Sequence, residues 1–192
     1  MLVTGLLLCA LAACATAPLS EEARPTSWAQ PVALDGVPNL HRVYGGLYRG
    51  GQPTARGFEA LAASGIKTVV SLRHFHDDTA LLAGTGLRSE RVPLDAGDVT
   101  EDEVIAALRV LTRSDIGPVF VHCEFGSDRA GAVIAAYRVV VERWSRDEAI
   151  AEMTRGGFGF HWIYSNLVGL IRALDVERVR REIADRGRET NP

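Results

Sequence analysis

The sequence predicts an α/β domain in which a mostly parallel central sheet of about four to five strands is flanked by helices. First, short apolar runs alternate with segments of helical periodicity along the chain. Second, residues 119–121 are wholly apolar, as expected of a strand buried on both faces. Third, 192 residues with 47% apolar side chains suit one domain with a sizeable core.

The individual elements follow from the same patterns. Strands are expected over residues 43–49, 67–72, 87–92 and 119–121. Helices are expected over residues 54–64, 78–83, 100–113, 129–144, 145–156, 163–173 and 176–184. Thr100 with Glu103 and Ser145 with Glu148 form capping boxes, which mark where two of these helices begin. Ligands bind such sheets outside the carboxyl ends of the strands, where the turn after residue 121 lies.

The N-terminal region has the pattern of a targeting segment. Residues 3–13 are almost wholly apolar but too few to span a bilayer as a helix, which favours a secretory signal. The stretch Leu-Ala-Ala-Cys at residues 11–14 resembles a bacterial lipoprotein box, which implies lipidation of Cys14. Because Ala15 follows, the resemblance implies a periplasmic protein anchored in the outer membrane. No Lys or Arg precedes the apolar run, and a cytoplasmic protein with an apolar N-terminus is the alternative.

These observations divide the chain into a lipoprotein-like signal (residues 1–14), an irregular tether (residues 15–41) and a folded domain (residues 42–187). The net charge of −3 and the lack of a basic stripe argue against nucleic-acid binding. The lipid anchor is therefore the only membrane contact expected. With Cys9 removed with the signal and Cys14 lipidated, Cys123 is the single cysteine left, so no internal disulfide can form.

The turn that follows residue 121 carries the chemistry. It reads His122-Cys123-Glu124-Phe125-Gly126-Ser127-Asp128-Arg129 and leads into a helix. A thiol at a helix N-terminus is stabilised as the thiolate by the helix dipole and the free N–H groups. The backbone N–H groups of residues 124–129 can curl around an anion, and Gly126 permits the tight bend. Arg129 adds a planar fork of donors that matches two phosphate oxygens.

This pattern of His-Cys, five residues and Arg resembles the protein tyrosine phosphatase superfamily, and Cys-x-x-Gly-x-Asp-Arg-x-Gly looks like its small bacterial dual-specificity-type members. The resemblance extends to residues 47–53 and 71–73 and covers most of residues 43–174. It implies a cysteine phosphatase-like fold, attack on phosphorus by Cys123 with a phosphocysteine intermediate, and a clamp made by Arg129. His122 would help to stabilise the thiolate. No metal or cofactor is implied, and the protein is expected to act as a monomer.

The resemblance also implies an aspartic acid on a separate loop that protonates the leaving oxygen. Asp98 has the best spacing to the cysteine and is preferred, with Asp95 as the second choice. Asp128, inside the loop itself, is the third, because some lipid phosphatases of the superfamily have an aspartate there. Asp98 could instead favour the N-terminus of the next helix through its charge, and Asp128 could pair with an arginine.

The expected substrates are proteins phosphorylated on tyrosine, serine or threonine, or small phosphomonoesters. A phosphoinositide or inositol-phosphate phosphatase is the alternative enzyme, although Glu124 and Asp128 favour a less anionic substrate. Many relatives have Ser or Thr where this chain has Ala130, and that hydroxyl helps the thiolate to depart. The missing hydroxyl at Ala130 predicts slow breakdown of the phosphoenzyme. It also leaves open the alternative that the protein is a catalytically weak phosphate-binding lipoprotein.

Overall fold

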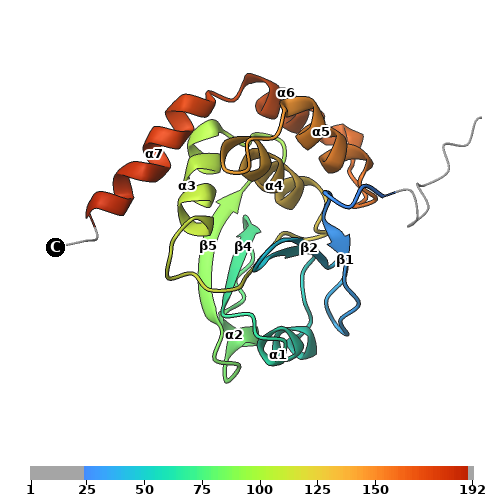
Figure 1. The fold of residues 1–192 in the computed structure, drawn as a ribbon. Coiled ribbons are helices and arrows are strands. Elements are labelled where there is room, and N and C mark those ends of the chain that lie inside the picture. Colours follow the sequence, from blue (N-terminus) through green and yellow to red (C-terminus); the bar gives the residue numbers. More distant parts are fainter. Residues whose placement is uncertain (1–23, 190–192) are drawn as a thin grey trace, which may run out of the picture.

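The computed structural model describes residues 24–189, which form a mixed six-stranded sheet with helices on both faces (Figure 1). The strand order is β1-β2-β3-β6-β4-β5. The strands are β1 (Gln30–Pro31), β2 (His41–Tyr44), β3 (Leu47–Gly50), β4 (Thr68–Arg73), β5 (Arg88–Leu94) and β6 (Val119–His122). The pairs β3–β6, β6–β4 and β4–β5 are parallel, and β1–β2 and β2–β3 are antiparallel. The predicted α/β class and mostly parallel centre are confirmed.

The sheet has more strands than expected because β1 was not predicted and because residues 43–49 are not one strand. They contain the end of β2, a turn at Gly45 and Gly46, and most of β3. Gly45 has a φ of 47°, in the left-handed region that a tight turn between antiparallel strands requires. The prediction read through this glycine pair and so missed a hairpin.

The folded domain also begins earlier than the predicted boundary at residue 42. Strand β1 pairs with β2, and Ala29, Val37 and Leu40 are buried in the core. Residues 24–41, which the sequence assigned to the irregular tether, are therefore part of the packed domain. The predicted signal and Cys14 lie outside the described residues. No helix within residues 24–189 is both long and apolar enough to cross a membrane.

The helices form two layers, one on each face of the sheet (Figure 1). One layer contains α1 (Ala55–Ala63) and α2 (Thr79–Leu82). The other contains α3 (Glu101–Leu111), α4 (Asp128–Val140), α5 (Arg146–Arg155), α6 (Asn166–Ala173) and α7 (Val176–Glu189). Both predicted capping boxes are present, at Thr100 with Glu103 and at Ser145 with Glu148. These caps explain why the starts of α3 and α5 could be predicted closely.

Successive side chains of β6 point to opposite faces of the sheet and so contribute to two separate hydrophobic cores. Val119 and Val121 of β6 belong to the core under α3–α7, whereas Phe120 between them packs with Phe58 of α1 on the opposite face. Helix α4 lies in the middle of its layer, and most of its residues are buried. It ends at Val140, earlier than the predicted residue 144. Its N-terminus and the carboxyl end of β6 therefore meet deep in the domain.

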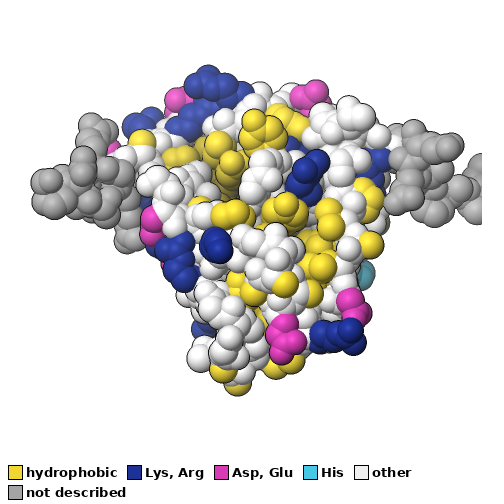
Figure 2. Space-filling view, turned by 60° about the horizontal axis from the view of Figure 1, so that its bottom comes forward, with side chains coloured by type: hydrophobic (Ala, Val, Ile, Leu, Met, Phe, Trp, Pro, Cys, Tyr) yellow, Lys and Arg dark blue, Asp and Glu magenta, His cyan; other side chains and the backbone are white. Residues whose placement is uncertain are grey.

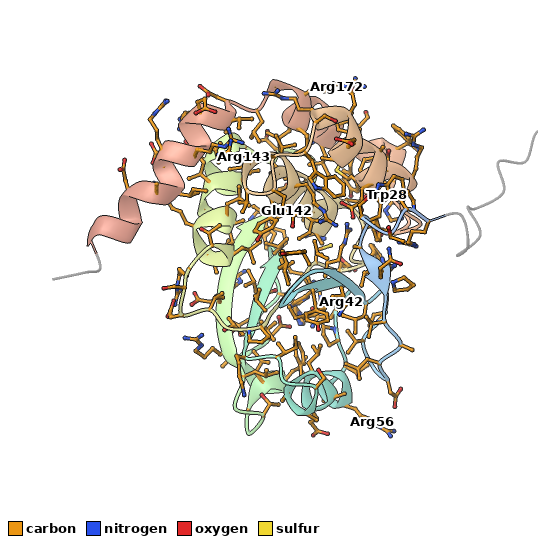
Figure 3. The ribbon with its side chains drawn as sticks, in the orientation of Figure 1. Trp28, Arg42, Arg56, Glu142, Arg143 and Arg172 are labelled. Carbon is orange, nitrogen blue, oxygen red and sulfur yellow. The ribbon has the colours of Figure 1, made fainter. Side chains whose placement is uncertain are left out.

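A groove of about 790 Å³ lies at the other end of α4. Trp28, Arg42 and Glu142 are among the residues that line it, and all three are labelled in Figure 3. Figure 2 shows hydrophobic side chains gathered across the middle of one face, with most charged side chains toward its margins. The groove is distinct from the cysteine-containing turn, since it lies near the C-terminal rather than the N-terminal end of α4.

Candidate active site

The carboxyl ends of the four parallel strands meet at one edge of the sheet. His122 at the end of β6 lies beside Gly50 of β3 and Ser71 of β4, and Arg73 of β4 pairs with Leu94 of β5. The segments that follow these strands therefore converge: residues 51–53, residues 74–78, residues 95–99 and the loop of residues 123–129, called the cysteine loop below. This is the edge at which the sequence predicted the site.

Cys123 is the first residue after β6 and is 2% exposed. The cysteine loop runs from it into the first turn of α4, so the thiol lies close to a helix N-terminus, where a thiolate is stabilised. Gly126 has a φ of 75°, and a Cβ there would lie 2.4 Å from the carbonyl carbon of Gly50. The loop therefore packs directly against the end of β3, and only glycine fits at its bend.

The carbonyl groups of the cysteine loop are held from outside by donors in the N-terminal part of the domain. The backbone N–H of Gln52 donates to the Glu124 carbonyl (3.0 Å), and Asn39 Nδ2 donates to the Phe125 carbonyl (2.9 Å). Arg49 Nη2 donates to the carbonyls of Gly126 (2.6 Å) and Ser127 (3.1 Å).

In a planar trans peptide the C=O and N–H groups point in opposite directions. Because the carbonyls of residues 124–127 are turned outward, the N–H groups of residues 125–128 face the other side of the loop. A row of N–H groups on the inside of such a bend attracts an anion. The hydrogen bonds around the loop thus support its predicted role in binding phosphate.

His122 is fully buried behind Cys123, and both of its ring nitrogens face oxygen atoms. Nε2 lies 2.9 Å from a carboxylate oxygen of Asp78, and Nδ1 lies 3.2 Å from the carbonyl oxygen of Cys123. Burial has the largest single effect and would raise the pKa of Asp78, but the hydrogen bond and charge of His122, together with the hydrogen bond from Gln52 and smaller effects, lower it overall. Asp78 also accepts a hydrogen bond from Gln52 Nε2 (2.7 Å). His122 therefore anchors the start of the cysteine loop.

Arg129 lies in the first turn of α4, with its side chain 15% exposed. Its Nη1 donates to the carbonyl of Leu94 (3.4 Å), which ties it to the end of β5. Its Nη2 lies 3.9 Å from a Glu124 carboxylate oxygen, and the same oxygen lies 3.8 Å from Nη2 of Arg73. The carboxylate of Glu124 thus sits between two guanidinium groups, one of which is the predicted clamp.

The three candidate acids differ in their surroundings. Asp95 and Asp98 are exposed in the turn after β5, directly after the residue that Arg129 contacts. Asp95 Oδ1 accepts the N–H of Gly97 (3.0 Å), which shapes this turn, whereas the Asp98 carboxylate forms no hydrogen bond within residues 24–189. Asp128 is buried and accepts hydrogen bonds from the backbone N–H and ring Nδ1 of His161, both at 2.8 Å. Asp128 thus pairs with His161 and not with an arginine, which the sequence had suggested as its partner.

The rim of the cysteine loop carries exposed aromatic side chains. Phe125 is 59% exposed, and its ring packs against that of His161 with centroids 5.6 Å apart. Trp162 follows His161 and is 65% exposed. An apolar surface thus adjoins the loop. Within residues 24–189, no group of His, Cys, Asp or Glu side chains is arranged to hold a metal ion.

Sequence reasoning missed Asn39, Arg49, Asp78 and His161 as parts of the site. Each contacts the cysteine loop or His122 from a distant part of the chain. A signal was available for Arg49, because a charged residue in a strand expected to be buried is unusual and implies a specific partner. For Asp78 and His161 the sequence holds no such local signal.

Comparison with known proteins places this geometry in a family. The family model described as DSP-PTPase phosphatase fused to NAD+ kinase matches residues 39–165. The dual specificity protein phosphatase TpbA of Pseudomonas aeruginosa strain UCBPP-PA14 is 36% identical over 167 residues, which cover 86% of this chain and 76% of TpbA. Inositol diphosphatase DSP2 of Oryza sativa subsp. japonica is 25% identical over 126 residues, 61% of each chain.

The solved structures agree with this relationship. The crystal structure of P. aeruginosa TpbA superposes with a TM-score of 0.74 at 36% sequence identity, covering 83% of this chain and 98% of TpbA. A cysteine-to-serine variant of TpbA in complex with phosphotyrosine gives the same TM-score of 0.74.

Proposed function

Because this chain belongs to the DSP-PTPase phosphatase family and is a dual-specificity-type phosphatase, we propose that it hydrolyses phosphomonoesters through a phosphocysteine intermediate on Cys123. The observation that carries the proposal is the inward orientation of the N–H groups of residues 125–128, fixed by outer hydrogen bonds to the loop carbonyls. Phosphoryl transfer needs little more than positioning and charge stabilisation, which such a loop supplies.

In the proposed first step, the Cys123 thiolate attacks phosphorus and the bond to the leaving oxygen breaks. Asp98 donates its proton to that oxygen, so a neutral alcohol or phenol departs. In the second step a water molecule attacks phosphorus, Asp98 takes its proton, and the S–P bond breaks to regenerate the thiolate. Throughout, Arg129 and the loop N–H groups stabilise the negative oxygens of the transferring group.

Acid quenching during turnover followed by mass spectrometry tests this route. We expect a phosphoryl group on the peptide that contains Cys123 in the wild type and none in Cys123→Ser. Arg129→Lys keeps the charge but loses the planar fork, so it is expected to lower kcat/KM by about 10²-fold. Full activity of Cys123→Ser would contradict the proposal.

Phosphotyrosine is the substrate group that we propose first. The binding of phosphotyrosine by the TpbA variant supports it, as does the exposed ring of Phe125 at the rim, which can pack on an aryl group. Phe125→Ala is then expected to raise KM for a phosphotyrosyl peptide more than for a phosphoseryl peptide of the same sequence. Equal effects on both peptides would argue against an aryl contact.

An inositol phosphate is the second candidate, supported by the inositol diphosphatase relative and by Arg73 beside the loop. Glu124 lies between Arg73 and Arg129, so its charge opposes a substrate with several phosphate groups. Glu124→Gln should therefore raise kcat/KM for inositol phosphates relative to phosphotyrosine. If the wild type already prefers inositol phosphates over phosphotyrosyl peptides, the first candidate is wrong.

We further propose that the protein is a periplasmic lipoprotein attached through Cys14, so that it meets its substrates outside the cytoplasm. The support is the Leu-Ala-Ala-Cys stretch after an apolar run. Metabolic labelling with a fatty-acid analogue should mark the wild type but not Cys14→Ala. A wild type that takes no label and remains in the cytoplasmic fraction would overturn this proposal.

A further inference from the structure

Arg49 is a buried charge that the proposed mechanism leaves without a role. Its side chain is among the largest that are fully buried, at 0% exposure. The guanidinium lies over the ring of Phe158, 3.9 Å from the centroid. Its Nη2 donates to the carbonyls of Gly126 and Ser127, whereas Nε and Nη1 are buried with no hydrogen-bond partner within residues 24–189. A buried ion of this kind is costly, so its retention needs a compensating interaction.

The nearby carboxylates do not supply a dedicated ion pair. Glu152 is bound by Arg138, with Nε at 2.8 Å and Nη2 at 2.8 Å, and also accepts the N–H of Ala29. Asp128 is bound by His161. Burial lowers the pKa of Arg49 to about 10, and the charges of Glu152 and then Cys123 oppose that shift. Arg49 thus remains charged at neutral pH, and within residues 24–189 its guanidinium donates hydrogen bonds only to the carbonyls of the cysteine loop.

The contacts of Arg49 also determine where two loop amides point. The Gly126 carbonyl shares its peptide plane with the N–H of Ser127, and the Ser127 carbonyl shares its plane with the N–H of Asp128. Drawing both carbonyls toward Arg49 turns both N–H groups toward the inner side of the cysteine loop. Arg49 of β3 therefore orients two of the four inward-facing N–H groups, those of Ser127 and Asp128.

We propose that Arg49 is a positioning residue that orients the amides of Ser127 and Asp128 toward the anion bound by the cysteine loop. It acts through the loop and does not touch the substrate. The inference rests on the proposed role of the cysteine loop in binding phosphate. It assigns the shape of the anion-binding side of the loop to a side chain of the neighbouring strand β3.

The experiment compares Arg49→Met, Arg49→Lys and the matched control Arg42→Met, which removes a charge from the exposed side of neighbouring β2. Binding of inorganic phosphate is measured at neutral pH in two ways, as protection of Cys123 from alkylation by iodoacetamide and as inhibition of hydrolysis. Circular dichroism checks that each variant is folded. Alkylation needs no turnover, so it still tests Arg49 if no phosphate ester is hydrolysed, an outcome that would instead contradict the proposed function.

Arg49→Met should weaken phosphate binding by more than about tenfold and lower kcat/KM by about 10²-fold. Arg49→Lys keeps the charge but cannot span both carbonyls with a planar fork, so its phosphate binding should also weaken, by about tenfold. Arg42→Met should leave phosphate binding and kcat/KM unchanged. A folded Arg49→Met with the wild-type phosphate affinity would overturn the proposal. If Arg49→Met does not fold, wild-type phosphate affinity in Arg49→Lys would do so.

Discussion

The carboxylate of Asp128 accepts two hydrogen bonds from His161, one from its backbone N–H and one from its ring Nδ1, both at 2.8 Å. These bonds tie the start of α4 to the segment between α5 and α6. The ring of His161 in turn packs against Phe125 in the cysteine loop. Asp128 therefore links the loop to a distant segment and is already engaged, which makes it a poor choice for the general acid.

Asp128→Asn tests this assignment. Loss of the charge should destabilise the protein by about 1–3 kcal/mol, because a buried acceptor is weakened beside its two donors. The kcat for alkyl and aryl phosphates should fall by a similar, small factor. Urea unfolding and steady-state kinetics measure both effects. A loss confined to alkyl phosphates, which need a proton on the leaving oxygen, would restore Asp128 as the acid.

Asp98→Asn should affect chemistry rather than stability. If Asp98 protonates the leaving group, kcat for an alkyl phosphate should fall by about 10²–10³-fold. The loss should be much smaller for p-nitrophenyl phosphate, whose leaving group departs without a proton. Asp95→Asn is the matched control from the same exposed turn. The reverse pattern, with Asp95→Asn giving the selective loss, would transfer the acid role to Asp95.

Ala130 predicts a rate-limiting second step. It is fully buried in the first turn of α4 and offers no hydroxyl to the departing thiolate. The wild type should show a burst of the leaving alcohol or phenol close to one equivalent of enzyme, followed by slow turnover. Ala130→Ser should shrink the burst and raise the steady-state rate by about tenfold. Stopped-flow measurement with an aryl phosphate gives both quantities, and a wild type without a burst would refute the expectation.

The buried pair of His122 and Asp78 should make stability depend on pH. The pKa of Asp78 is lower in the folded protein than its ordinary value, because burial is opposed by His122 and by hydrogen bonds from its other neighbours, which together outweigh it. Such a carboxyl adds stability above its unfolded pKa, about 3.9, and that stability is lost as pH falls through the lower folded value. Asp78→Asn should therefore cost about 2 kcal/mol near pH 7. In urea unfolding the difference from the wild type should shrink below about pH 4, and a constant difference would contradict it.

Gly126→Ala should disrupt the site through the backbone. The residue has a φ of 75°, and the added Cβ would meet backbone atoms of Gly50 and Gly51 at 2.4 Å and 2.5 Å. We expect kcat/KM to fall by more than about tenfold, because the loop must move off β3. Gly65→Ala is the control, since its φ is 94° but no atom lies within 4 Å of the added Cβ. It should cost about 1–2 kcal/mol of stability with kinetics unchanged.

The local features of this chain could be predicted because their signals are local. The capping boxes at Thr100 and Ser145 mark helix starts, and the apolar residues 119–121 mark a central strand. The cysteine loop could be found because its residues are contiguous. The hairpin at Gly45 was missed although the glycine pair was visible, because the flanking runs read as one strand. That error is one of interpretation rather than of missing information.

The supports of the loop could not be predicted for a different reason. Asn39 lies 86 residues from Phe125, and Arg49 lies 77 residues from Gly126 along the chain. Such pairings depend on how β3 and β6 come to lie side by side, which no local pattern specifies. The choice between Asp95 and Asp98 depends on side-chain direction within an exposed turn, which spacing alone does not determine.

The outer hydrogen bonds to the cysteine loop limit how the site can be moved to other proteins. Grafting residues 122–131 alone onto a foreign strand–helix junction would carry over the nucleophile and the clamp but not Gln52, Asn39 or Arg49, which hold the carbonyls outward. The transplanted segment would be free to turn its carbonyl oxygens toward the anion and repel it. A working graft would also need to bring residues 39–52, which carry these three supports, as a second segment from elsewhere in the chain.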